Sequence, residues 1–569
     1  GDPHHIVANP GGDTDPDDSD PLLSDFSDTG FTAVHADPKT LRQAQASPEA
    51  DHWIAAIHAE LESLRANGTW EEVHRDQLPR GQRVLQCRFL FKTKLDQHGK
   101  VARYKARLVA MGHLQREGID YHEVYAPVAH LTTLRVLFAM AASFKRTAQN
   151  MDIVTAFLQS VGIKEDIYLA PPAGLDFDSS TLFKLLKPIY GLKQSPREWN
   201  NTIHKWLVDD FGFTASAADP CLYVHRGAEQ FLAAVIWVDD IVYFGNCDET
   251  EQRFATAITE RFAVKLLGPA TFVLGIQVET APSGIKLTQS KYIEEILTKL
   301  NMAKCKPAST PMVPHTVLQR FHDQDKVDSD PQRQPLPPPL AKLYREVVGS
   351  LIYLVSCTRP DLANAVSQLS QCVAHPLREH MVAAKHVLRY LRGTSQLGIT
   401  YSSSATQATD PVLVGYADAS YGTVPHSRRS ITGYVFMVGN GTVSWKTKVQ
   451  PTVALSTAEA EYMAACAAAQ EAKFLRSILL DFGVAQPPTV IHEDNQPAIN
   501  IAENRLTSQR TKHIDIKYHF IREAIADGTI KLQYIPTAEQ LADILTKILP
   551  APQTAKLRDT IAGLRKLTR

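Results

Sequence analysis

Residues 231–245, FLAAVIWVDDIVYFG, place two adjacent carboxylates, Asp239 and Asp240, between two apolar runs. Runs of this length, rich in β-branched and aromatic residues, are typical of strands with a buried face. Burying an ionised carboxylate without a partner costs several kcal/mol. The pair therefore lies either at a turn tip in water or in a site where something neutralises it.

A third carboxylate, Asp152 in MDIVTAFL, also has apolar surroundings. If the two runs pair as a hairpin beside the strand of Asp152, the three carboxylates meet. Two Mg²⁺ ions about 3.5–4 Å apart require hard oxygen ligands and would neutralise such a cluster. For the Asp239–Asp240 pair taken alone, a solvated turn is the alternative.

The size and composition predict several globular domains, because 569 residues with 44% apolar and 21% charged side chains exceed a single core. The chain contains no apolar stretch of membrane-spanning length and no signal peptide pattern, and its first residue, Gly1, predicts a fragment of a longer protein. Seven scattered cysteines without CxxC spacing predict reduced thiols and no structural zinc.

Residues 1–38 contain nine Asp and no Lys or Arg, which predicts an acidic disordered tether. The rest of the chain then has 60 basic against 52 acidic residues, a balance that permits a polyanionic partner. Within the tether, Asp28-Thr29-Gly30 is the tripeptide of aspartic proteases. Its flanks lack the apolar strands that such a site requires, so we predict no protease there.

The segment after the tether predicts a helix followed by a hairpin. The helix begins at Ser47-Pro48, with Ser as its cap and Pro as its first residue, and ends near Asn67-Gly68. Its apolar face is predicted to contain Trp53, Ile54, Ile57, Leu61 and Leu64. The runs VLQCRFLFKTKL and VARYKARLVAMG then predict two strands joined at 97–100, with Lys105 and Arg107 on one face.

Further along the chain, helical and strand patterns alternate from 134 to 303 and end in the amphipathic segment SKYIEEILTKLNM. A proline-rich linker is predicted at 304–342, and a helical connection at 343–410. Residues 411–548 show strand, strands, helix, strand and helix in that order. A basic tail, 549–569, carries Lys556, Arg558, Arg565, Lys566 and Arg569.

The segments YKARLVAMG, REGIDYHEVYAPVAHLTTLR, MDIVTAFLQS, KPIYGLKQSPREWN and WVDDIVYF, in this order, resemble the reverse transcriptase of copia-type retrotransposons. The resemblance extends from about residue 40 to 548. It implies a multidomain α/β (α+β) protein whose residues 39–303 form a right-hand polymerase with fingers, palm and thumb. By this resemblance Asp152 and Asp239 hold the catalytic Mg²⁺ ions, and Asp240 completes the acidic set.

The same resemblance implies a set of nucleotide-binding residues. Lys105 and Arg107 resemble the basic residues that clamp the triphosphate, and Phe157 the aromatic that excludes a ribose 2′ hydroxyl. The segment KPIYGLKQSPREW adds Tyr190, Gly191, Lys193 and Gln194. Read without the resemblance, the first two residues suit a solvated strand edge and Phe157 suits a core.

Trp237 departs from the family pattern, which usually has Tyr before Val-Asp-Asp. A bulkier ring beside the metal ions would alter fidelity or activity, or it would mark a decayed element.

A second acidic set follows the linker. It comprises Asp418 in VLVGYADAS, Glu459 and Glu461 in STAEAEYMAA, Asp494 in TVIHEDN and Asp543 in AEQLADILTK. These spacings resemble the ribonuclease H domain of the same family, a mixed sheet with flanking helices in which four carboxylates bind two Mg²⁺ ions. Ser456 and Glu459 fit a capping box, in which Glu459 reaches back to the backbone of Ser456, so Glu461 is the predicted ligand.

In TKHIDIKYHFIRE, the side chains of His513, Asp515 and His519 are expected to support the site or touch nucleic acid rather than bind zinc. The predicted function is an RNA-directed DNA polymerase with ribonuclease H, acting inside the cell and away from membranes. Its partners would be an RNA template, a DNA or tRNA primer, the RNA–DNA hybrid and deoxynucleoside triphosphates, with Mg²⁺ or Mn²⁺ as cofactor. The alternatives are a degenerate or domesticated copy that only binds nucleic acid, and a hydrolase beside an inactive polymerase.

Overall fold

The computed structural model describes residues 37–95, 101–320, 330, 333–402, 411–503 and 516–565. The chain divides into two compact units, the first formed by 1–124 with 162–195 and the second by 125–161 with 196–569. The fold is mixed α/β, as predicted. Within the described ranges, every helix is too short or too polar to cross a membrane.

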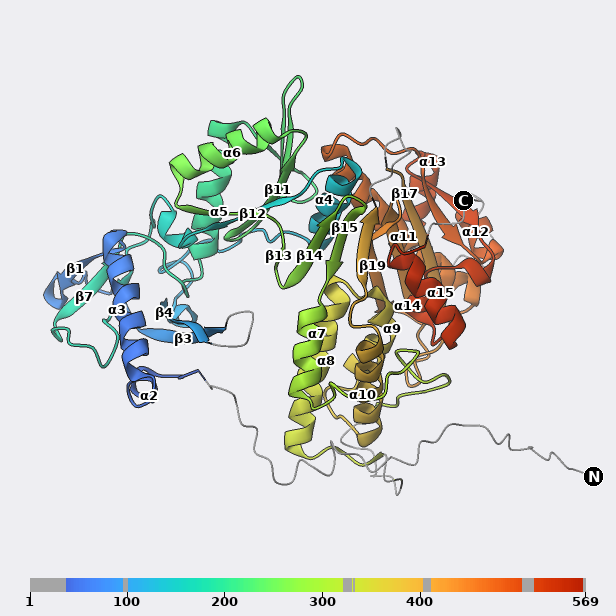
Figure 1. Ribbon diagram of the computed structural model, residues 1–569, viewed down its shortest axis with the longest axis horizontal. Coiled ribbons are helices and arrows are strands. Elements are labelled where there is room, and N and C mark those ends of the chain that lie inside the picture. The colour runs from blue at the N-terminus through green and yellow to red at the C-terminus, as the bar shows by residue number, and fades with distance from the viewer. Residues whose placement is uncertain are drawn as a thin grey trace, which may run out of the picture. The chain divides into compact units, whose positions relative to one another are not determined.

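The first unit combines two small sheets with two helices (Figure 1). A four-stranded sheet has the order β1-β7-β6-β2, and a separate hairpin is formed by β3 and β4. Its elements are α2 (Leu41–Gln45), α3 (Ala50–Ala66), β1 (Trp70–His74), η2 (Arg75–Gln77), β2 (Val84–Leu85), β3 (Cys87–Leu95), β4 (Val101–Ala110), η3 (Gly112–Leu114), β6 (Tyr168–Leu169) and β7 (Thr181–Leu185).

The helix α3 packs one apolar face on the β3–β4 hairpin. The Trp53 ring meets Phe91 and Tyr104 edge-on, with centroids 5.3 and 4.7 Å apart. The sequence-based prediction is wrong in two details: α3 begins at Ala50 rather than at Pro48, and Ile54 is 37% exposed. The antiparallel pairing of β3 and β4 is confirmed, and the connecting residues 97–100 lie outside the described ranges.

The second unit begins with a six-stranded sheet of order β12-β5-β11-β10-β9-β8. Its strands are β5 (Gln149–Ile153), β8 (Thr214–Ala215), β9 (Leu222–Arg226), β10 (Phe231–Trp237), β11 (Asp240–Gly245) and β12 (Val264–Pro269). The helical segments among them are α4 (Leu131–Ser143), η4 (Ala156–Gln159), α5 (Ser195–Lys205), η5 (Trp206–Phe211) and α6 (Asp248–Arg261). Every strand of this sheet pairs with its neighbour in antiparallel orientation.

A second sheet of this unit joins segments from both sides of the predicted linker. Strand β15 (Gly284–Thr288) pairs with β16 (Gly398–Ser402), in the order β13-β14-β15-β16. The other elements are β13 (Phe272–Val273), β14 (Ile276–Ala281), α7 (Ser290–Lys299), α8 (Pro338–Cys357), η7 (Pro360–Leu362), α9 (Ala363–Ser370) and α10 (Arg378–Gly393). The segment predicted as linker thus already contains the first turn of α8, and the predicted helical connection ends in a strand.

The last sheet has the order β19-β18-β17-β20-β21, with β17, β20 and β21 parallel. Its strands are β17 (Leu413–Ser420), β18 (Ile431–Val438), β19 (Gly441–Val449), β20 (Thr489–Glu493) and β21 (Ile530–Tyr534). Its helical segments are α11 (Thr457–Asp481), α12 (Gln496–Glu503), η9 (Ile516–His519), α13 (Phe520–Ala526), η10 (Thr537–Glu539), α14 (Asp543–Thr546) and α15 (Ala551–Ile561). Strand β21 is absent from the order of elements predicted from the sequence.

One hydrophobic core runs through the first and last sheets of the second unit. Phe138 of α4, Val235 of β10 and Leu475 of α11 belong to the same buried cluster, and α4 contacts both α11 and β19, as can be followed in Figure 1. Arg135 of α4 is buried in this contact, where it donates to the carbonyls of Val443 (2.7 Å) and Ser356 (2.8 Å). The first bond ties α4 to strand β19 of the last sheet, and the second ties α4 to α8.

A buried ion pair connects η7 to α10. The Arg359 guanidinium donates to both carboxylate oxygens of Asp361 (2.9 and 2.8 Å), and the Tyr390 hydroxyl donates to the same carboxylate (2.9 Å). Arg359 is 0% and Asp361 2% exposed. Because removing one partner leaves a buried charge without compensation, Asp361→Ala is expected to lower the free energy of unfolding by about 3–5 kcal/mol.

Chemical denaturation measures this loss, and Glu346→Ala is the matched control. Glu346 pairs with Lys342 across one turn of α8 (3.9 Å) and with Lys299 (3.6 Å), but all three side chains are exposed, so its removal should cost less than about 1 kcal/mol. If both variants lost the same free energy of unfolding, burial would not be what makes the Arg359–Asp361 pair important for stability.

Candidate functional site

The acidic hairpin has the geometry predicted for it. Strands β10 and β11 pair antiparallel with Trp237 opposite Asp240, so Val238 and Asp239 form a two-residue turn. On the other edge of β11, Asp240 lies directly opposite Asp152 of β5. Residues directly opposite in an antiparallel pair point to the same face, with Cβ atoms about 4.5–5.5 Å apart. Asp152 and Asp240 therefore share one face at one end of the sheet, Asp239 lies in the adjoining turn, and each of the three is partly exposed.

The backbone of the acidic turn is strained and held in place. Val238 has a left-handed φ of 58°, which is rare for a β-branched residue. Its carbonyl accepts the indole N–H of Trp199 in α5 (2.6 Å), and the Asp239 carbonyl accepts the N–H of Ile153 (2.8 Å). Two hydrogen bonds from neighbouring elements thus hold the turn that presents Asp239.

The electrostatics of this cluster favour a cation. Burial, followed by the charges of Asp239 and Asp152, raises the pKa of Asp240 to about 6. On the far side of β5, Lys265 of β12 is the register partner of Asp152.

Phe157 in η4 is 8% exposed, so its ring belongs to the buried side of this region. Its predicted selection against a 2′ hydroxyl stays a prediction.

The second acidic set meets around the ends of β17 and β20. Asp418 lies on β17, Glu461 on the first turns of α11, Asp494 directly after β20, and Asp543 at the first residue of α14. One oxygen from each of Asp418, Asp494 and Asp543 lies within 4.8 Å of the others. The structure brings all four predicted ligands together, and their role as ligands stays a prediction.

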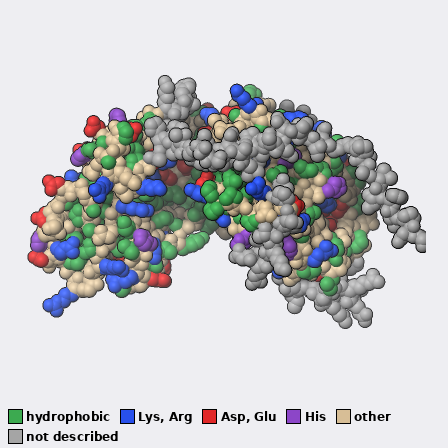
Figure 2. All heavy atoms as spheres, turned by 90° about the horizontal axis from the view of Figure 1, so that it is seen from below, with side chains coloured by type: hydrophobic (Ala, Val, Ile, Leu, Met, Phe, Trp, Pro, Cys, Tyr) green, Lys and Arg blue, Asp and Glu red, His purple; other side chains and the backbone are tan. Residues whose placement is uncertain are grey.

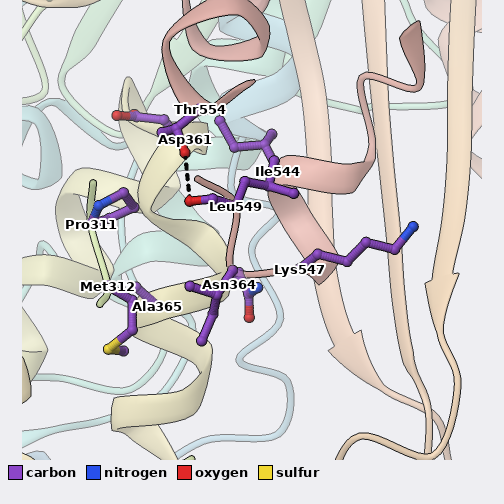
Figure 3. A pocket seen from close by; sticks show the side chains of 10 residues that line it. Pro311, Met312, Asp361, Asn364, Ala365, Ile544, Lys547, Leu549 and Thr554 are labelled. Carbon is purple, nitrogen blue, oxygen red and sulfur yellow. Dashed lines mark hydrogen bonds between the residues drawn. The ribbon is translucent and has the colours of Figure 1, made fainter. Parts of the chain in front are cut away.

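A lysine bridges two of these carboxylates. The Lys547 ammonium donates to Asp418 Oδ1 (2.9 Å) and to Asp543 Oδ1 (2.6 Å), and the Thr546 hydroxyl donates to Asp418 Oδ2. In Figure 3 the stem of Lys547 lines a small pocket with Asn364 and Leu549, while its nitrogen points away from that pocket. Lys547 therefore supplies one positive charge to the α14 side of the set.

The α11 side of the set contains a further acid, Glu493, the last residue of β20. One oxygen from each of Glu461, Glu493 and Asp494 lies within 4.8 Å of the others. Burial, followed by the charge of Glu493, raises the pKa of Glu461, and burial with the charge of Asp418 raises that of Glu493. Oε2 of Glu461 and Oε2 of Glu493 are buried without a hydrogen-bond partner within the described part of the chain. Crowded, oxygen-only donors with orphaned atoms fit hard divalent cations such as Mg²⁺.

Glu459 is separated from this set by its local contacts. Ser456 caps α11 by accepting the N–H of Glu459 (3.2 Å), and the Glu459 carboxylate accepts the N–H of Leu455 (2.8 Å). Glu459 thus reaches back toward the start of the helix as predicted. The N–H that its carboxylate accepts is that of Leu455, one residue before the predicted Ser456. His519 contacts the Tyr462 hydroxyl (2.9 Å), whereas His513 and Asp515 lie outside the described residues.

In the first unit, Lys105 and Arg107 lie on the same face of β4, and both are partly exposed. The Arg107 guanidinium stacks on the Tyr190 ring at 4.4 Å, and the Tyr190 carbonyl accepts the N–H of Ala110 (2.9 Å). Burial, followed by the charge of Arg107, lowers the pKa of Lys105. On the face that Figure 2 shows, Lys and Arg side chains are scattered among hydrophobic and acidic ones.

The rest of the segment predicted to bind nucleotide also contacts the end of β4. Gly191 has φ of +94°, and any Cβ there would collide with the backbone of Ala110. The Lys193 ammonium contacts the Tyr121 hydroxyl (3.1 Å). Gln194 is 1% exposed and its amide bonds to Gln115 and to the Asp120 carbonyl (both 2.9 Å). Gln194 therefore orders the segment from within, and its direct binding of nucleotide stays a prediction.

Three residues of these sites were missed by reasoning from the sequence: Trp199, Glu493 and Lys547. Lys547 follows Asp543 by four residues, a helical spacing that could have signalled an ion pair. Glu493 precedes Asp494 directly, and only its burial distinguishes it from an ordinary strand-end acid. No local signal connects Trp199 to Val238, which is 39 residues away.

Comparison with known proteins agrees with the motifs. Residues 67–314 match a family described as reverse transcriptase (RNA-dependent DNA polymerase). The Pol polyprotein from transposon TNT 1-94 of Nicotiana tabacum is 37% identical over 92% of this chain and 39% of that protein. The Pol polyprotein from transposon RE1 of Arabidopsis thaliana is 34% identical, over 92% of this chain and 34% of that protein. The chain thus spans about a third to two fifths of these relatives.

Among solved structures, RNase H1 from the halophilic archaeon Halobacterium salinarum NRC-1 is similar to 24% of this chain over 93% of its own length, with 19% identity and a TM-score of 0.17.

Proposed function

This chain belongs to the copia-type retrotransposon Pol polyproteins, and from that membership we propose that it is an RNA-directed DNA polymerase joined to a ribonuclease H. The observation that carries the proposal is the register of the first sheet, in which Asp240 lies opposite Asp152 and Asp239 forms the adjoining turn. Besides burial, the charges of Asp239 and Asp152 raise the pKa of Asp240, so these carboxylates from two separate chain segments repel one another and bound cations would stabilise them.

In the polymerase site, Asp152, Asp239 and Asp240 would hold two Mg²⁺ ions. Bound divalent cations supply charge neutralisation at the transferring phosphoryl group and activate the attacking oxygen. The chain itself contributes positioning: the bond from Trp199 holds the turn of Asp239, and the β11–β5 pairing fixes the spacing of the other two acids. Trp237, the last residue of β10, lies beside these acids as the register partner of Asp240.

The basic face of β4 would bind the phosphates of a deoxynucleoside triphosphate. Lys105 and Arg107 present two cations on one strand face, and Tyr190 stacks on the second of them. Two cations two residues apart in a strand can contact adjacent phosphates. We assign Lys193 and the Gly191 backbone to the same task, with the RNA template and its primer as the other partners.

In the ribonuclease H site, Asp418, Glu461, Asp494 and Asp543 would hold the metal ions that direct water at the RNA strand of a hybrid. The orphaned Glu461 oxygen and the shared position of Asp494 support this assignment. Lys547 keeps two of the acids in place by binding both. The assignment of residues 411–548 to a ribonuclease H-like fold is part of the proposal.

The test is extension of a primer annealed to an RNA template, alongside cleavage of an RNA–DNA hybrid, by the native chain. We expect both activities with Mg²⁺ and neither with EDTA, and we expect Mg²⁺ in excess of EDTA to restore both. Failure of both activities in folded protein would leave the reading of a degenerate copy that only binds nucleic acid.

One observation favours a second candidate, a hydrolase beside an inactive polymerase. Within the described residues, the groups of three acidic side chains with oxygens within 4.8 Å of one another all belong to the second set. Trp237 in place of the usual Tyr points the same way. Cleavage without extension by the native chain would establish this candidate.

A further inference from the structure

We propose that Glu493 is a fifth metal-binding carboxylate, which forms with Glu461 and Asp494 a cation position on the α11 side of the ribonuclease H site. This inference rests on the proposed function and extends it, because the four acids expected from the sequence do not include Glu493. Two overlapping triads, Asp418–Asp494–Asp543 and Glu461–Glu493–Asp494, share only Asp494. The arrangement therefore has one position on each side of a single bridging acid.

The placement of Glu493 follows from strand geometry. In β20, Thr489, Ile491 and Glu493 are buried, whereas the residues between them are partly exposed. Side chains alternate between the two faces of a strand, and Ile491 belongs to the core cluster that contains the α11 residues Ala465 and Ala468. Glu493 thus faces α11, the helix that carries Glu461.

The charge of Glu493 is poorly compensated by the protein. Its side chain is 0% exposed, and Oε1 accepts the N–H of Asn495 (3.1 Å). Its Oε2 has no hydrogen-bond partner in the described structure, and the same holds for Oε2 of Glu461, which is 4% exposed. A buried carboxylate in this state is costly unless it is paired or coordinates a metal.

The ammonium of Lys547 lowers the pKa of Glu461 only through space, because its salt bridges go to the other side of the site. Its two carboxylate contacts are Asp418 and Asp543, the acids of the other triad. Within the described residues, the α11-side triad consists of three carboxylates with no salt bridge to Lys or Arg among them. A divalent cation is the partner that three convergent oxygens suit.

The experiment compares Glu493→Gln with the native chain. Gln keeps the acceptor oxygen for the Asn495 N–H and has the same shape, but it is a weaker ligand. Mn²⁺ binding, followed by the electron paramagnetic resonance signal of free Mn²⁺, should weaken by about 10- to 100-fold at one position per chain. In EDTA, the melting temperature should stay unchanged or rise, because like charges no longer repel each other in a buried place.

Glu459→Gln is the matched control. Glu459 is a buried acid of the same helix as Glu461, but its carboxylate accepts the Leu455 N–H and it belongs to neither triad. Its Mn²⁺ titration should match that of the native chain. A lower melting temperature in EDTA with an unchanged Mn²⁺ titration for Glu493→Gln would overturn the inference and make Glu493 a structural residue.

Cleavage assays separate this inference from the function on which it depends. Native protein that cleaves the hybrid while Glu493→Gln binds Mn²⁺ normally refutes only the fifth ligand. Native protein that binds Mn²⁺ at this set but never cleaves refutes the ribonuclease assignment and leaves the metal position standing.

Discussion

Replacing Asp239 by Asn is expected to lower primer extension by about 10³-fold while hybrid cleavage stays at the native rate. Asp239 forms the turn between β10 and β11, beside the register pair Asp240 and Asp152. Asn lacks the negative charge of a ligand carboxylate, so a two-cation site loses several kcal/mol of stabilisation at the transferring phosphoryl group. A loss of about 4 kcal/mol corresponds to a rate lower by about 10³-fold. Single-turnover extension on an RNA template measures the change.

The matched control for this variant is Asp209→Asn, which removes an exposed carboxylate from η5 in the same unit. Its extension rate should equal that of the native chain. If Asp239→Asn extended primers at the native rate, the three aspartates would not be a catalytic set, and the hairpin would be an ordinary solvated turn. If it lost cleavage as well, the variant would report unfolding of the shared core rather than loss of a ligand.

The reciprocal variant, Asp494→Asn, is expected to abolish hybrid cleavage by a similar factor of about 10³ and to leave extension intact. Asp494 is the one residue common to both acidic triads of the second set. Its loss therefore weakens the ligand set on both sides at once, which predicts a larger effect than loss of Asp543 alone. Cleavage of a labelled RNA strand in a hybrid provides the measurement.

Asp527→Asn serves as the control for that variant. Asp527 is exposed at the end of α13, where it accepts the N–H of Thr529 (2.8 Å), an interaction that Asn retains. Native cleavage is expected. Unchanged cleavage in Asp494→Asn would show that the second set is not a nuclease site, whatever cations it binds.

Much of the first acidic site could be predicted from the sequence, because the relevant order is local. Two apolar runs separated by two residues can pair only as a tight hairpin, which places Asp239 at its tip. The α3 helix was predictable for the same reason, since its buried face repeats at helical spacing. Its start was misplaced by two residues, because the Ser47 hydroxyl donates to the Ala44 carbonyl (2.9 Å) at the end of α2 instead of capping α3.

Other features could not be predicted, because they depend on which segments pack together. The pairing of β15 with β16 joins strands more than a hundred residues apart across the predicted linker. The bonds of Arg135 reach Val443 and Ser356, and no pattern around Arg135 marks these partners. Likewise, the residues Val238-Asp239-Asp240 do not by themselves predict the strained φ of Val238 or the hydrogen bond from Trp199 that supports it.

The sequence by itself determined the family of this protein, the identity of seven candidate ligands and the strand, turn or helix near which each lies, because these depend on residue order and short-range periodicity. The exclusion of Glu459 also followed from the sequence, through its place beside the helix cap Ser456. Only the tertiary structure decided that Glu493 joins the second set. The physical reason is that burial and the direction of a side chain are set by the neighbouring elements, and here α11 covers the face of β20 on which Glu493 lies.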